Sequence, residues 1–364
     1  MKILHIIYTL GPAGAERFVL DICNELFDRG HEVYLCTMWD DRYNNQGFYV
    51  PEITPGVHYI NLRIPPGFRL SNIFRFYKLI RKIKPDIVHC HLNLVNYIFP
   101  LIWLFRKVRF FHTIHNDAPK EVKSRLEYFI RKNFYKNGWI RAITISEEST
   151  RSFAEYYGTE RYTEICNGRS KPVASEEFWN VKHFVEKLRE GNKMIFLHVA
   201  RCAAQKNQEL LIRTFNRLLK ENFPVVLLVV GLDFDLPQGQ ELKKRAMKGI
   251  WFLGEKHNVT DYYLNADAFC LTSIYEGMPI TLIESFACGC IPICTPVGGI
   301  ISTIRNGVNG FIAPSVSEED YYNTVREYMD FRNLIHKKDL MDFFDKHLSI
   351  KICVRKHILE YQKN

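Results

Sequence analysis

Two acidic side chains eight residues apart are the residues of this chain best placed to do chemistry. They are Glu276 and Glu284, within the segment 275–292. Gly277 and Pro279 indicate a loop and predict a helix beginning near Pro279. Glu276 would then lie just before the helix and Glu284 in its second turn, where together they could accept hydrogen bonds from two sets of hydroxyls on one long ligand. The alternative is that Glu284, among apolar neighbours, has a salt-bridge partner inside the fold.

Two cationic side chains follow an expected strand in the second half of the chain. Arg201 and Lys206 stand five residues apart after the apolar run 194–199, at a predicted strand-to-helix turn. Both could reach one polyanion there, because open α/β sheets bind ligands at the carboxyl ends of their strands. The alternative is that Lys206 is solvated and Arg201 pairs with a carboxylate.

A turn of small residues, 9–17, connects the first expected strand to the first expected helix and contains Gly11 and Gly14. Amides at such a helix N-terminus attract anions such as phosphate. The spacing is not G-x-G-x-x-G, so a nicotinamide dinucleotide is not indicated. Taken alone, the turn is explained by a tight strand-to-helix connection.

The elements that must position these residues alternate between short β-rich runs and helical patterns. This alternation stops in the mixed-charge segment 169–192 and then restarts, which predicts two α/β domains, each built on a parallel sheet. We place the first domain at 1–175 and the second at 190–345. A C-terminal helix, 346–364, is expected to pack back on the first domain.

Composition supports a globular chain of two domains. The chain has 364 residues, of which 47% are hydrophobic and 24% charged, and this excludes a disordered, collagen-like or coiled-coil protein. The ten cysteines lie mostly in apolar runs without repeated C-x-x-C spacing, so neither a disulfide framework nor a zinc knuckle is expected. No apolar run approaches the roughly 20 residues of a membrane-spanning helix, and no signal peptide is evident. A cytoplasmic location is expected.

The positive charge is concentrated in one region. The net charge is +9, and residues 61–141 hold 17 Lys and Arg against 4 Asp and Glu, interleaved with aromatic residues. This pattern suits peripheral binding to an anionic membrane, at its inner face, although solvated amphipathic helices would look the same. Nucleic acid would also suit the basic residues, but it leaves the acidic pair unexplained and is not expected as a partner.

A family resemblance follows from these motifs. The segment 265–310, with the E-x7-E spacing of Glu276 and Glu284, resembles the C-terminal signature of the group 4 family of glycosyltransferases. Those enzymes are retaining, depend on nucleotide sugars and have the GT-B fold, in which two Rossmann-like domains face each other across a cleft. Ser302 departs from the pattern, since relatives often have Glu there. The other matching residues are Arg201, Lys206, Gly14-Ala15-Glu16-Arg17 and Thr113-Ile114-His115.

The resemblance implies a role for each matching residue. Arg201 and Lys206 would hold the diphosphate of the donor, and Glu284 would bind its ribose. No metal or other cofactor is expected, because cationic side chains and helix N-termini would stabilise the leaving diphosphate. A satisfied strand-end histidine is the alternative for His115. The remaining implied contacts are Glu276 and the backbone of Gly277, Met278 and Pro279 with the transferred sugar, His115 with the same sugar, Gly14 near the phosphates and Leu253 near the nucleobase.

The implied function is retaining transfer of a hexose-type sugar from a nucleotide diphosphate sugar to a glycan or lipid-linked acceptor, in surface polysaccharide or glycolipid synthesis. A nucleotide-sugar epimerase of the same fold is one alternative. A non-catalytic subunit that binds sugar nucleotides is another. The sugar, the nucleobase and the acceptor stay open, since they depend on loop contacts.

Overall fold

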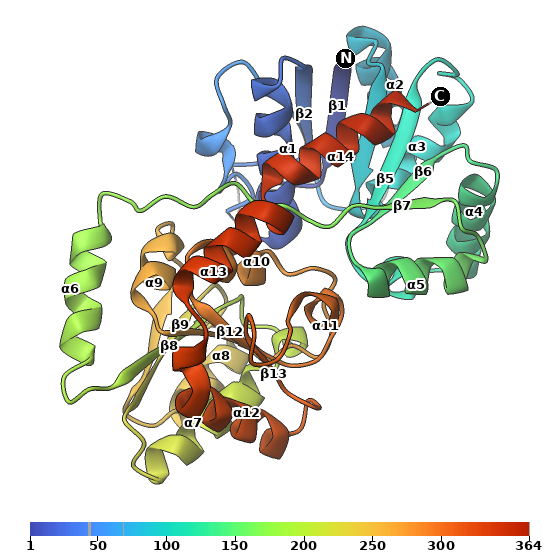
Figure 1. Ribbon diagram of the computed structural model, residues 1–364. Coiled ribbons are helices and arrows are strands. Elements are labelled where there is room, and N and C mark those ends of the chain that lie inside the picture. Colours follow the sequence, from blue (N-terminus) through green and yellow to red (C-terminus); the bar gives the residue numbers. More distant parts are fainter. Residues whose placement is uncertain (43–44, 68, 364) are drawn as a thin grey trace. The chain divides into compact units, whose positions relative to one another are not determined.

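The computed structural model describes residues 1–42, 45–67 and 69–363 (Figure 1). It divides into two compact units, each containing one parallel sheet. The first unit comprises Met1–Ser170 with the C-terminal segment Ser349–Asn364, and the second comprises Lys171–Leu348. The predicted α/β class with two parallel sheets is therefore confirmed.

The sheet of the first unit has seven parallel strands in the order β3-β2-β1-β4-β5-β6-β7. Its central strands are apolar runs buried on both faces, as expected for a sheet covered by helices on each side. The strands are β1 (Lys2–Ile7), β2 (Glu32–Trp39), β3 (His58–Ile64), β4 (Ile87–His91), β5 (Arg109–Ile114), β6 (Arg141–Thr144) and β7 (Tyr162–Glu164).

Helices cover the two faces of this sheet differently. Alternate residues of β1 and β4, such as Leu4 and Val88, belong to a core that includes residues of α2, α3, α4 and α5. The opposite face packs against α14, which lies beside α1, and the predicted return of the C-terminal helix to the first domain is confirmed (Figure 1). The helices are α1 (Gly14–Asp28), α2 (Ser71–Ile83), α3 (Val95–Ile102), α4 (Arg125–Lys136), α5 (Glu147–Tyr157) and α14 (Ile350–Gln362), with short 3-10 turns η1 (Val50–Glu52), η2 (Leu92–Leu94) and η3 (Ala118–Glu121).

The sheet of the second unit has six parallel strands in the order β10-β9-β8-β11-β12-β13. β9 is buried at every position, in keeping with its unbroken run of Val and Leu. The strands are β8 (Met194–Val199), β9 (Val225–Val230), β10 (Ile250–Gly254), β11 (Ala268–Leu271), β12 (Ile291–Cys294) and β13 (Phe311–Ile312).

The segment left between the two predicted domains forms a helix, α6 (Phe178–Leu188), which packs on α9 within the second unit. None of the described helices is long and apolar enough to cross a membrane. The other helices of this unit are α7 (Gln208–Lys220), α8 (Pro237–Arg245), α9 (Val259–Asn265), α10 (Ile280–Ala287), α11 (Gly299–Thr303), α12 (Glu318–Phe331) and α13 (Lys337–Phe343), with η4 (Ala204–Lys206), η5 (Arg332–Leu334) and a π-helical turn, η6 (Phe344–Leu348).

Candidate functional site

The loops that follow β8 and β11 are joined at the carboxyl edge of the second sheet. These strands are neighbours, so their carboxyl ends meet. The Gln205 side chain donates from Nε2 to the Tyr275 carbonyl at 2.9 Å, and the Ile274 amide donates to the Gln205 carbonyl at 2.8 Å. Thr272 Oγ1 donates to the Lys206 carbonyl at 2.9 Å. Tertiary hydrogen bonds therefore bring together two motifs that lie about 70 residues apart in the chain.

The contact between these motifs is an ion pair. Lys206 Nζ lies 2.5 Å from Glu276 Oε1, and the same oxygen accepts a hydrogen bond from Ser273 Oγ at 2.6 Å. Only 7% of the Glu276 side chain and 17% of the Lys206 side chain are exposed. Lys206, expected at the diphosphate, and Glu276, expected at the transferred sugar, are thus in direct contact at a site that is largely shielded from solvent.

Arg201 is held through its backbone. Gln208 Nε2 donates to the Arg201 carbonyl at 2.8 Å and lies 3.3 Å from His198 Nε2, while His198 Nδ1 lies 2.9 Å from the Cys270 carbonyl. Burial lowers the pKa of His198 to about 4, so the ring is neutral, with its proton on the Nδ1 that faces the carbonyl. The Arg201 side chain is exposed and makes no ion pair with any described residue, which leaves it available to an anion.

Glu276 and Glu284 occupy the positions relative to helix α10 that the sequence predicts. The helix begins at Ile280 with Pro279 as its N-cap, and no side chain caps it. Glu276 precedes the helix, and Glu284 lies in its second turn, half-buried. Met278 is buried, and the Gly277 carbonyl accepts a hydrogen bond from the amide of Gly299, the first residue of α11, at 2.7 Å. The loop and helix predicted for this motif are confirmed.

Two glycines allow the loops at this edge to approach closely, and the sequence analysis missed both. A Cβ on Gly298, whose φ is +52°, would lie 1.9 Å from the Glu276 carbonyl oxygen. A Cβ on Gly231, whose φ is +154°, would lie 1.9 Å from the Ala200 carbonyl oxygen. The Gly-Gly pair before α11 was the available sequence signal for the first of them.

Leu253 lies at the end of β10, on the same edge. Its neighbour Gly254 accepts a hydrogen bond from the Gly231 amide at 2.9 Å, and Gly231 follows the adjacent strand β9. Leu253 is partly exposed. An apolar side chain at this position suits the face of a nucleobase.

In the first unit, His115 follows β5 directly and is held by a buried carboxylate. The amides of His115 and Asn116 donate to Glu121 Oε1 at 2.8 and 3.2 Å. Glu121 Oε2 lies 3.7 Å from Nη1 of Arg131, which is fully buried. Burial raises the pKa of Glu121 to about 7, with Arg131 and the two amides acting in the opposite direction. The sequence analysis missed Glu121 and Arg131, which belong to the basic stretch interpreted as surface.

A layer of histidines lies behind His115, on the sheet face that α1 and α14 cover. His91 Nδ1 lies 3.1 Å from His115 Nε2, and His5 Nδ1 lies 3.0 Å from His91 Nε2. His5, His89 and His91 are the one described group whose ligand atoms, all within 4.8 Å, could share a metal ion. His89 is already bonded at both nitrogens, to Tyr361 and Thr113, and its neighbour His91 to the two other histidines. A metal ion would have to displace these bonds.

Gly14 is the first residue of α1 and is exposed. The Gly11 amide is satisfied by Thr9 Oγ1 at 3.2 Å, and no side chain caps the helix. The turn therefore has the geometry expected for a helix N-terminus that an anion could approach.

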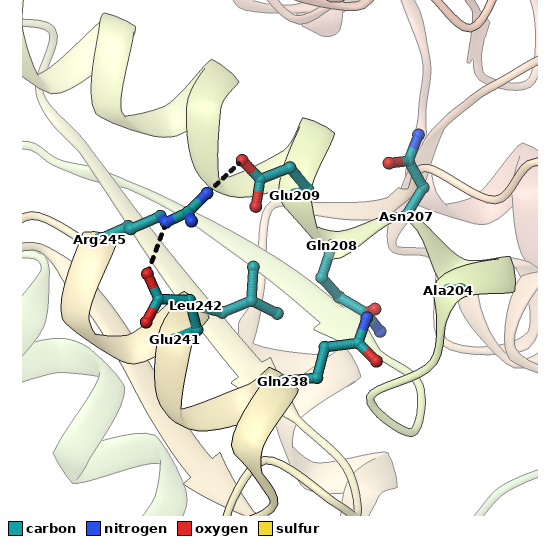
Figure 2. A pocket seen from close by; sticks show the side chains of 8 residues that line it. All are labelled: Ala204, Asn207, Gln208, Glu209, Gln238, Glu241, Leu242 and Arg245. Carbon is teal, nitrogen blue, oxygen red and sulfur yellow. Dashed lines mark hydrogen bonds and ion pairs between the residues drawn. The ribbon is translucent and has the colours of Figure 1, made fainter.

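A pocket of about 340 Å³ opens between the N-terminal part of α7 and helix α8 (Figure 2). Arg245 on one side forms ion pairs with Glu209 at 3.0 Å and Glu241 at 3.1 Å, which hold this wall together. Asn207 and Gln208 line the pocket beside the loop of Lys206. None of the predicted site residues lines it.

Two family profiles match consecutive parts of the chain. The profile described as Glycosyltransferase Family 4 matches residues 12–170, and the one described as Glycosyl transferases group 1 matches residues 181–339. The chain therefore belongs to the glycosyltransferase family that these two profiles describe. The predicted family and the predicted class of enzyme are confirmed.

Similar proteins carry related names. The glycosyltransferase is 22% identical, over 82% of both chains, to the capsular polysaccharide biosynthesis glycosyltransferase CapH of Staphylococcus aureus. It is 23% identical to an Escherichia coli UDP-Gal:alpha-D-GlcNAc-diphosphoundecaprenol alpha-1,3-galactosyltransferase, over 78% of its own length and 75% of the relative's.

Solved structures show the fold. Anabaena HepE in complex with UDP-glucose matches the glycosyltransferase with a TM-score of 0.79 and 16% identity, over 99% of this chain and 98% of that one. Sucrose-phosphate synthase from Thermosynechococcus elongatus matches with a TM-score of 0.77 and 17% identity, over 100% and 98%. The GT-B fold expected from the sequence is confirmed.

Proposed function

We propose that this glycosyltransferase transfers a sugar from a nucleotide diphosphate sugar to a glycan or lipid-linked acceptor, with retained anomeric configuration, in polysaccharide or glycolipid synthesis. The observation that carries the proposal is the 2.5 Å contact between Lys206 and Glu276. It unites the cationic and acidic motifs at the strand ends where α/β sheets bind ligands.

The mechanism follows from the charge that develops on the donor. Cleavage of the sugar–phosphate bond builds negative charge on the diphosphate, which Arg201, Lys206 and the N-terminal amides of α10 stabilise. The sugar gains positive character, which the nearby Glu276 carboxylate favours. With these cationic groups at the leaving group, we expect transfer to require no added metal ion.

The names of similar proteins support the choice of donor and acceptor. HepE binds UDP-glucose, and the Escherichia coli relative is named for a UDP-sugar donor and a diphosphoundecaprenol-linked acceptor. By analogy we assign a UDP-sugar as the first donor to test and a polyprenyl-diphosphate-linked sugar as the first acceptor.

The test has two stages. A thermal-shift panel of nucleotide diphosphate sugars identifies the donor, and sugar transfer is then measured with that donor, with the anomeric configuration of the product determined by NMR. An inverted product, or an epimerised sugar nucleotide formed without acceptor, would contradict the proposal.

Arg201→Ala is expected to remove the thermal shift produced by the best nucleotide sugar. The melting temperature without ligand should change by less than about 1 °C, because the exposed guanidinium has no ionic partner among the described residues. Differential scanning fluorimetry with and without ligand measures both quantities. Arg213→Ala, which removes an exposed guanidinium of α7 together with its ion pairs to Glu209 and Glu318, is the control and should keep the full shift. An undiminished shift in the Arg201 variant would remove this residue from the donor site.

The proposed partner also includes an anionic membrane. Two helices on one face of the first sheet, α2 and α4, carry exposed apolar side chains near their N-terminal ends, among basic residues. Phe74 and Phe129 are 58% and 57% exposed, and Leu70 and Leu126 are 70% and 71% exposed. Helix N-termini that follow parallel strands lie at the carboxyl edge of the sheet, the edge that holds His115. The exposed basic neighbours are Arg69, Arg75, Lys78, Lys123 and Arg125.

We expect the protein to co-sediment with vesicles containing phosphatidylglycerol at low salt. Phe74→Ser combined with Phe129→Ser should reduce the bound fraction several-fold, since both rings would otherwise insert among the head groups. Trp179→Ser, at an exposed ring of α6 in the second unit, is the control and should bind like the parent. Equal binding to neutral and anionic vesicles, or none to either, would contradict an anionic membrane as the partner.

A further inference from the structure

His115 ends a continuous chain of three imidazole rings. Its Nε2 contacts His91 Nδ1 at 3.1 Å, and His91 Nε2 contacts His5 Nδ1 at 3.0 Å. His5 and His91 are fully buried, whereas 8% of His115 is exposed. His115 Nδ1 makes no hydrogen bond to a described residue, so it is the outer end of the chain. Its inner end is His5 Nε2, a buried atom without a partner.

All three rings are neutral at pH 7. Burial lowers the pKa of His5 and of His115 to about 3 and the pKa of His91 well below its usual value. A neutral imidazole has one N–H and one lone pair. His91, bonded to an imidazole at each nitrogen, must therefore donate at one and accept at the other.

Only two proton arrangements satisfy both contacts. In the first, every N–H points from His5 toward His115, which leaves a lone pair at His5 Nε2 and an N–H at His115 Nδ1. In the second, every N–H is reversed, and His5 Nε2 carries a buried N–H without an acceptor. His357, which packs over this face from α14, does not supply that acceptor, because its own Nε2 is also without a partner.

The two arrangements differ in free energy because only the second buries an N–H without an acceptor at His5 Nε2. Among buried main-chain groups, N–H donors without an acceptor are rarer than carbonyls without a donor, and the same order is taken for the imidazole nitrogens. We propose that His91 and His5 are positioning residues that fix the tautomer of His115, so that His115 presents Nδ1–H as a hydrogen-bond donor to the sugar. The part concerning the sugar rests on the proposed function, whereas the tautomer itself does not.

The backbone of His115 is fixed as well. Glu121 accepts a hydrogen bond from the His115 amide at 2.8 Å, so the ring is anchored from two sides. His91 and Glu121 together determine where Nδ1–H points and that it is a donor.

The tautomer can be read directly by long-range proton–nitrogen NMR on the full chain with 15N-labelled histidine. The chain has 13 histidines, and the His115 signals are assigned by their loss in His115→Gln. We expect the proton on Nδ1 of His115. A proton on Nε2 in the parent protein would overturn the proposal without the need for any further variant.

Two substitutions at His91 separate its effect on the tautomer of His115 from its contribution to packing. His91→Asn keeps an N–H near the Nδ1 position and should preserve both the His115 tautomer and kcat/KM. His91→Leu removes that donor, so His115 should become a mixture of tautomers and kcat/KM should fall roughly 10-fold or more. An unchanged His115 signal in folded His91→Leu would overturn the proposal.

His112→Leu is the matched control for the loss of a buried histidine. His112 is fully buried on the opposite face of the same sheet, where it contacts the Tyr135 hydroxyl at 2.7 Å and the Leu92 carbonyl at 2.8 Å. This variant should lose stability but keep the His115 tautomer. If no sugar transfer is found for the parent protein, the proposed function fails while the NMR result still decides the proton order.

Discussion

Lys206→Ala is expected to slow sugar transfer by about two to three orders of magnitude and also to lower the melting temperature of the protein without ligand. The lysine is the cation that would stabilise the leaving diphosphate, and loss of such a group costs about 10²–10³-fold in kcat. It is also the ionic partner of Glu276, of which 7% is exposed. Removing one member of a buried pair leaves an unpaired charge, at a cost of about 3–5 kcal/mol. Activity assays and calorimetry of the full chain measure the two effects.

Glu276→Gln and the double variant Lys206→Ala/Glu276→Gln complete a mutant cycle with Lys206→Ala. The Gln side chain can still accept the hydrogen bond from Ser273 Oγ, which lies 2.6 Å from Glu276 Oε1. The double variant buries no unpaired charge, so it should recover most of the stability but none of the activity. If Lys206→Ala melts like the parent and keeps its activity, the ion pair contributes neither to stability nor to catalysis.

Acidification from pH 7.5 to 5.5 is expected to destabilise the first unit strongly. Six of its histidines are fully or almost fully buried, and burial is the first cause of the lowered pKa of each one. The unfolded chain takes up protons as the pH falls below about 6.5, whereas the folded chain does not do so until much lower pH. Stability is therefore complete above pH 6.5 and is lost as the pH falls. The six are His5 and His115 with a pKa of about 3, His357 with a pKa of about 4, and His89, His91 and His112 with lowered values.

Each of these histidines contributes up to about 1.4 kcal/mol per pH unit below 6.5. Glu121, whose pKa is raised to about 7, acts in the opposite direction and offsets about one of the six, so the net loss still approaches the stability of a typical domain. Thermal melts across this pH range measure the loss. His91→Asn should flatten the pH dependence, while His58→Gln, at an exposed position in the same unit, should leave it unchanged. A melting temperature that stays constant between pH 7.5 and 5.5 would contradict a neutral histidine layer.

Several features follow from local sequence patterns alone. Runs such as Val225–Val230 are short, rich in Val and apolar at every position, which favours a strand covered on both faces. Pro279 after Gly277 predicts the start of α10, and that start places Glu284 in the second turn. These signals are local, because periodicity and turn chemistry act over a few residues. They were sufficient for the fold class, the family and the candidate residues of the second unit.

Other features depend on contacts between distant segments. Nothing near Lys206 in the sequence indicates that Glu276 neutralises it, since the pair forms only because β8 and β11 are neighbours in the sheet. The sequence pattern of α4 does not reveal which of its aromatic and basic residues are buried. In the structure Arg131 and Tyr135 are buried, whereas Phe129 is exposed.

The sequence by itself determined that this protein has two parallel α/β units and the motifs of a glycosyltransferase. Only the tertiary structure decided the surroundings of those motifs: the carboxylate of Glu121 beneath His115, and the histidine layer built from β1, β4 and α14. The physical reason is that parallel strands become neighbours through crossovers of many residues, so side chains far apart in the chain meet at one sheet. Periodicity reveals which residues are buried, but not what they are buried against.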